Sequence, residues 1–136
     1  MAKMRKLTSL KKVVIFLAFS ILVLTGSLLY YSKAYYPSLP FDSATKRDVL
    51  HVLKLAEGKL AKVTEEDGYE WYVARQGEAD EQLQDMMTDR GWQLVEQMGS
   101  AFLFKRGEAT LIIESEMWTR YYVLFQIPSG VRSSQV

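Results

Sequence analysis

The most prominent feature of the hydropathy pattern is an uninterrupted apolar run at residues 13–31, VVIFLAFSILVLTGSLLYY, which contains no charged residue. A helix rises about 1.5 Å per residue, so this run would cover roughly 28 Å, close to the hydrocarbon thickness of a bilayer. Tyr30 and Tyr31 fall where an aromatic belt would meet the lipid headgroups. The run therefore predicts a single transmembrane helix.

Beyond this run the apolar positions follow shorter patterns. Residues 32–41 include two prolines and are expected to form a stiff juxtamembrane spacer. Apolar residues then recur at helical spacing from Val49 to Leu60, which predicts a helix over 44–57 that ends at Gly58. The candidate N-caps ahead of this helix are Asp42, Ser43 and Thr45.

Two strands and a second helix are expected next. Alternating runs at 59–64 and 69–75 flank an acidic turn at 65–68, which ends in a glycine suited to positive φ. The pattern then predicts a helix over 78–90, because acids crowd its first turn and Gly91 fits the cap at its C-terminus.

From residue 92 onward the apolar pattern has a period of two. Four runs joined by short turns predict an antiparallel meander over 92–98, 101–106, 109–115 and 121–127. Two-residue turns would divide the apolar side chains of the first three runs between the two faces of the sheet. One face would carry Val95, Phe102, Phe104, Leu111 and Ile113, and the other Trp92, Leu94, Met98, Leu103 and Ile112.

The predicted fold class is α+β. An N-terminal transmembrane helix precedes a small domain at 42–128 with an antiparallel sheet, in the order helix, strand, strand, helix, four-strand meander, and a polar tail follows at 129–136. The sheet is apolar on both sides. Either the two helices cover it, one per face, or one face is left for a partner subunit or a second copy of the chain.

The charges are divided unevenly along the chain. The first twelve residues hold five basic residues and no acid, whereas the chain after Lys33 has eleven basic residues against sixteen acids, a net charge of −5. The positive-inside rule then places residues 1–12 in the cytoplasm and the domain outside it, at the cell membrane. A domain of this charge is not expected to bind nucleic acid, because phosphate affinity rests on clustered Lys and Arg.

A cleaved signal peptide is the alternative to a retained anchor. Ser32-Lys33-Ala34 resembles a small-x-small cleavage site, and cleavage after Ala34 would release a secreted binding or inhibitor domain. The apolar run exceeds the roughly 7–15 residues usual in such peptides, which favours retention. A pilin-like helix is disfavoured, because Pro37 interrupts the chain soon after the run.

Few residues point to catalysis. The chain has no cysteine and a single histidine, His51, which argues against thiolate chemistry and a multi-histidine metal site, and we expect no cofactor. Glu114 and Glu116 share a face of a predicted strand and are the candidates for a carboxylate acid–base pair. Such a pair more often forms a solvated face, so an enzyme is the least favoured class.

The segment 117–122, MWTRYY, combines aromatic residues with an arginine, the residue types that anchor interfaces. It either contacts a partner or forms a hairpin turn in which Trp118 folds back over the sheet edge. The candidate partner-contact residues are Trp118, Arg120, Tyr122, Trp92 and Leu103. We therefore expect a membrane-anchored, non-catalytic domain that binds or regulates another cell-envelope component or a second copy.

Overall fold

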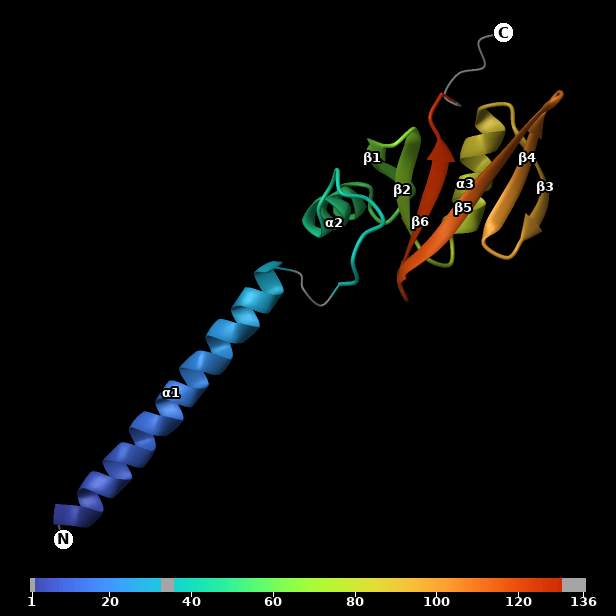
Figure 1. Cartoon of the computed structure of the whole chain (residues 1–136). Helices are drawn as coiled ribbons and strands as arrows, with labels where there is room; N and C mark the ends of the chain where they lie inside the picture. The colour runs from blue at the N-terminus through green and yellow to red at the C-terminus, as the bar shows by residue number, and fades with distance from the viewer. Residues whose placement is uncertain (1, 33–35, 131–136) are drawn as a thin grey trace. The chain divides into compact units, whose positions relative to one another are not determined.

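The computed structural model describes residues 2–32 and 36–130, apart from the side chains of residues 2–4. The chain divides into two compact units, residues 1–36 and 37–136. The first unit holds one helix, α1 (Ala2–Ser32), and the second holds two helices and one antiparallel sheet (Figure 1). The predicted fold class, a long apolar N-terminal helix followed by an α+β domain, is confirmed.

The helices and strands of the second unit follow the predicted order. They are α2 (Lys46–Leu55), β1 (Ala61–Glu66), β2 (Tyr69–Arg75), α3 (Ala79–Asp89), β3 (Gln93–Met98), β4 (Ala101–Arg106), β5 (Ala109–Thr119) and β6 (Tyr122–Pro128). The strands lie in the order β1-β2-β6-β5-β4-β3 (Figure 1). The last strand, β6, pairs antiparallel with β2 and so joins the first hairpin to the meander in one sheet.

The helix α1 is long and apolar enough to cross a membrane. Its polar groups are accommodated within the helix, because Ser20 and Thr25 donate their hydroxyls to the carbonyls of Phe16 and Ile21 at 2.9 and 2.8 Å. The helix begins well before residue 13, so the expected basic segment continues the same helix. The expected cleavage site, Ser32-Lys33-Ala34, includes Lys33 and Ala34, which lie outside the described residues.

The helix α2 is capped at its N-terminus by Thr45, one of the predicted caps. The Thr45 hydroxyl accepts from the backbone N–H of Asp48, and the Asp48 carboxylate accepts from the backbone N–H of Thr45, which completes a capping box. Val49 and Leu53 are buried where α2 packs against β1 and β2. Phe41 is also buried, so the segment predicted as a spacer packs on the domain from Pro37 onward.

The helix α3 covers the opposite face of the sheet and builds the larger core. Ala79, Leu83 and Met87 on its inner side pack against β2, β6, β5, β4 and the residue before β3. The buried partners are Tyr72, Ala74, Trp92, Phe102, Phe104, Leu111, Ile113, Val123, Phe125 and Ile127. Gly91, at φ 84°, ends the helix as predicted, and the N–H of Trp92 donates to the Met87 carbonyl at 2.9 Å.

The predicted register of the first hairpin of the meander is wrong, because β3 contains a bulge at Val95. The pairing of β4 with β5 is the predicted one, but that of β3 with β4 slips by one residue between Leu94 and Glu96. A one-residue slip moves every preceding side chain to the other face. Leu94 and Trp92 therefore lie on the core face, and Val95, expected in the core, is 52% exposed.

Candidate functional site

One half of the sheet is left open by α2. This helix packs on β1 and β2, and beyond them the same side of β5, β4 and β3 carries side chains that face solvent. We call this surface the open face and define it by Met98, Leu103, Ile112, Glu114 and Glu116. Ile112 is 52% and Met98 49% exposed. The structure thus combines both predicted alternatives: each face has a helix, and one face is only partly covered.

Two of the apolar residues of the open face are direct cross-strand partners, and the third lies on the neighbouring row of the sheet. Leu103 on β4 pairs directly with Ile112 on β5, and Met98 on β3 pairs with Ala101 on β4. Leu103 is only half-buried, because no helix among the described residues lies over it. The polar part of the face comes from Glu114 and Glu116, which are both exposed.

Two small hollows continue the open face toward β2. They have volumes of 190 and 220 Å³, and both are lined by Glu114 and Gln126. Glu116 and Trp71 line the first, and Ile112 lines the second. The candidate acid–base pair, Glu114 and Glu116, is therefore exposed beside hollows that are smaller than a typical ligand pocket. This geometry suits contact with a partner better than enclosure of a small substrate.

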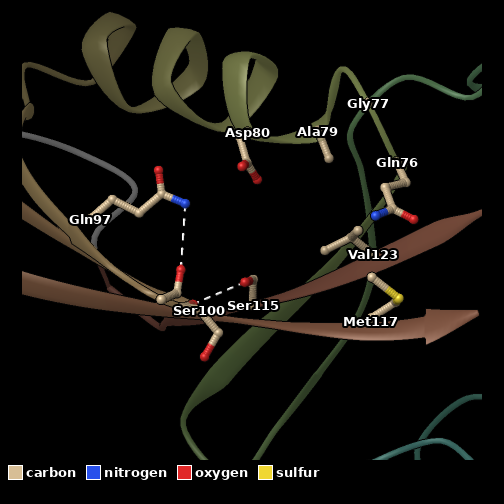
Figure 2. A pocket seen from close by; sticks show the side chains of 10 residues that line it. Gln76, Gly77, Ala79, Asp80, Gln97, Ser100, Ser115, Met117 and Val123 are labelled. Atoms are coloured by element: carbon tan, nitrogen blue, oxygen red, sulfur yellow. Dashed lines mark hydrogen bonds between the residues drawn. The ribbon is translucent and has the colours of Figure 1, made fainter. Parts of the chain in front are cut away.

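A larger pocket of 510 Å³ lies on the opposite side of the sheet, between the first turn of α3 and the turn that joins β3 to β4 (Figure 2). Asp80 points into it from α3, and Ser115 and Met117 line it from β5 (Figure 2). The Ser115 hydroxyl donates to the carbonyl of Ser100 at 2.9 Å. The chain's single histidine, His51, is on α2 and does not line this pocket. The lining therefore offers hydrogen bonds and one carboxylate, but no histidine base for the serine.

A buried carboxylate was missed by the sequence analysis. Glu70 on β2 is only 3% exposed. It accepts from Lys62 Nζ at 3.0 Å and from the Tyr72 hydroxyl at 3.2 Å, and Arg90 in turn donates to that hydroxyl at 3.2 Å. The only sequence signal for the burial of Glu70 is that it shares one face of the strand with Tyr72 and Ala74. The cross-strand lysine that makes burial possible could not be assigned before the pairing was known.

Three of the five expected contact residues lie at the β5–β6 hairpin. Trp118 is 4% exposed and its indole donates to the Pro37 carbonyl at 2.9 Å. The half-buried ring of Tyr122 lies 6.4 Å from that of Trp118, and Arg120 is exposed in the intervening turn. Trp118 is therefore covered by the chain itself, which matches the alternative in which it folds back.

The other two expected contact residues lie apart from this hairpin. Leu103 belongs to the open face, as predicted. Trp92 was expected on the same face, but the slip at Val95 places it in the core at 4% exposure. The Arg106 guanidinium lies 4.5 Å from the centre of its ring. Its ring is therefore withdrawn from solvent.

Comparisons with known proteins give no match: the chain matches no protein-family model, no curated protein and no solved structure. Within residues 2–32 and 36–130, no group of three or more His, Asp or Glu side chains is placed to hold a metal ion. The structural observation that bears most directly on function is the open face.

Proposed function

We propose that this protein is a single-pass membrane-anchored protein whose domain lies outside the cytoplasm and acts by binding another component of the cell envelope. The anchor would be α1, with the basic N-terminus in the cytoplasm and the domain of net negative charge on the other side. The action would be non-catalytic. Holding the domain at the membrane raises its local concentration beside partners in the same membrane.

The observation that carries the proposal is the group of uncovered apolar side chains on the open face. Fully burying a large aliphatic side chain contributes about 1.5–3 kcal/mol, so a residue that is half exposed has about 1 kcal/mol still to gain. Met98 and Ile112 are such residues. Leu103 pairs directly with Ile112, whereas Met98 lies two residues along β3 from Glu96, the direct partner of Leu103. Glu114 and Glu116 border this group and would favour a partner that presents basic side chains.

The test is site-specific photocrosslinking of the full chain in its native membrane. A photoreactive residue at Ile112 should give one adduct of defined mass, whereas the same residue at Thr88, exposed on α3, should not. Met98→Lys should abolish the Ile112 adduct by placing a cation in the contact. Because Met98 is already 49% exposed, this change should leave the melting temperature unaltered.

The mass of the crosslinked adduct identifies the kind of partner. An adduct of twice the chain mass identifies a second copy as the partner, and a heavier or lighter adduct identifies a different protein. If Ile112 and Thr88 give the same products, or if Met98→Lys leaves the adduct intact, the open face is not the binding surface. Recovery of a shortened chain outside the membrane fraction would show instead that the domain is released.

A further inference from the structure

The turn between β5 and β6 exposes side chains that suit a lipid headgroup region. Tyr121 and Met117 are each 60% exposed, which is high for large side chains of a folded domain. The Arg120 guanidinium lies 5.1 Å from the centre of the Tyr121 ring. Tyrosine and arginine are the residues that combine an apolar body with a polar or cationic end at membrane interfaces.

The same turn is tied to the segment that follows α1. The Trp118 indole holds the Pro37 carbonyl at 2.9 Å, and Trp118 immediately precedes the end of β5. Pro37 follows Ser32, the last residue of α1, by five positions. Five residues span at most about 18 Å when fully extended. This limit comes from the covalent chain and holds for every arrangement of the two units.

We propose that the β5–β6 turn contacts the phospholipid headgroups around the anchor, with Tyr121 entering the interface and Arg120 binding lipid phosphate. The inference rests on the proposed membrane anchor. Tyr30 and Tyr31 at the end of α1 mark the expected interface, and the chain length keeps Trp118 and its turn close to it. The turn thus becomes a second point of attachment, and it limits how the domain stands above the bilayer.

The charges near the β5–β6 turn determine how its contact with the bilayer depends on the headgroup charge of the lipid. Arg120 attracts phosphate, as does the exposed Arg75, which pairs with Tyr122. The exposed acids Glu78 and Asp80 at the start of α3 lie at the same end of the sheet and oppose that attraction. We therefore expect contact with zwitterionic phosphatidylcholine vesicles. Phosphatidylglycerol should strengthen that contact by no more than about five-fold, the gain typical of one basic residue at an anionic surface.

The experiment uses the absence of cysteine from the chain, which allows one fluorescent label per variant. Gln76→Cys places the label beside the turn without altering it, because the Gln76 N–H donates to the Tyr121 carbonyl at 2.8 Å. Gln76 and Met117 both line the pocket of Figure 2. Glu108→Cys is the control at the other end of β5, about 30 Å away for a strand of this length.

The full chain is reconstituted in vesicles that contain lipid with a nitroxide on its headgroup, and quenching of each label is measured. The label at Gln76 should be quenched at least about two-fold more than that at Glu108, consistent with interfacial contact. Combining Arg120→Gln with Tyr121→Ala should reduce the quenching at Gln76 to the level of the control. Equal quenching at the two positions, or no change in the double variant, would overturn the proposal.

A third label separates this inference from the anchor on which it depends. Leu22→Cys lies in the middle of the apolar run and should be quenched by nitroxides placed deep in the acyl chains. Deep quenching at Leu22 without headgroup quenching at Gln76 would leave the anchor standing and refute the turn contact. No quenching at Leu22 would refute both.

Discussion

Replacing Glu70 by glutamine tests whether the buried ion pair on β2 and β1 stabilises the domain. Glu70 is 3% exposed and its Oε1 lies 3.0 Å from Lys62 Nζ. Breaking a fully buried pair by removing one partner costs about 3–5 kcal/mol, because a desolvated charge is left behind. The Lys62 side chain is 27% exposed and also contacts Glu65 at 3.1 Å, so it keeps solvent and a second counterion.

The expected cost of Glu70→Gln is therefore smaller, about 2 kcal/mol of the free energy of unfolding. Glutamine keeps an oxygen that can accept from the Tyr72 hydroxyl, which Glu70 Oε2 now does at 3.2 Å. The matched control is Glu65→Gln, since Glu65 pairs with the same lysine but is 52% exposed. An exposed pair contributes about 0–1 kcal/mol, so the control should lose little stability.

The assay is urea unfolding of the full chain in detergent, followed by tryptophan fluorescence. All three tryptophans, Trp71, Trp92 and Trp118, are buried in the domain, so the signal reports on its unfolding. A cycle that adds Lys62→Met should show a coupling of about 1–2 kcal/mol with Glu70→Gln. If Glu70→Gln costs no more than Glu65→Gln, or the coupling is absent, the buried pair does not stabilise the domain.

Three further substitutions test the hydrophobic core, the C-terminal end of α3 and the N-terminal cap of α2. Phe104→Ala should lower the free energy of unfolding by about 3–5 kcal/mol in the same assay, because Phe104 is 0% exposed. The control is Leu55→Ala: Leu55 is 71% exposed, so this change should alter the free energy of unfolding by less than about 0.5 kcal/mol. Gly91→Ala should cost about 1–3 kcal/mol, since it forces a side chain to adopt a φ of 84°. The backbone N–H and hydroxyl of Thr45 hold the pKa of Asp48 below its ordinary value of 3.8. The Asp48 carboxylate therefore stabilises the domain above pH 3.8, and this contribution is lost as the pH falls through the lowered pKa. Asp48→Asn should therefore flatten the acid side of the melting-temperature profile, and an unchanged profile would contradict the role of the cap.

Most of the secondary structure could be predicted from the chain because its signals are local. The two strands before α3 are joined by Asp67 and Gly68, both at positive φ, where the sequence placed an acidic turn ending in glycine. Gly91 ends α3 for the same kind of reason: few other residues tolerate the left-handed conformation. The cap at Thr45 needs only a carboxylate three residues later.

The candidate site was only partly predictable. The row of Leu103 and Ile112 follows from the two-residue turn between β4 and β5, and it is observed. The exposure of that row depends on where α2 packs, which no local pattern states. Trp118 shows the same limit, because its burial requires the Pro37 carbonyl, which lies far away in the sequence.

The sequence by itself determined the long apolar helix, the order of helices and strands, and the two-residue period of the meander, because each depends on residues within a few positions of one another. Only the tertiary structure decided that β6 pairs with β2, that Glu70 is buried beside Lys62, and that Trp92 lies in the core. The physical reason is most direct at Val95. A single extra residue in β3 turns every earlier side chain to the other face, and whether a strand bulges is settled by the packing of α3 and β4 around it.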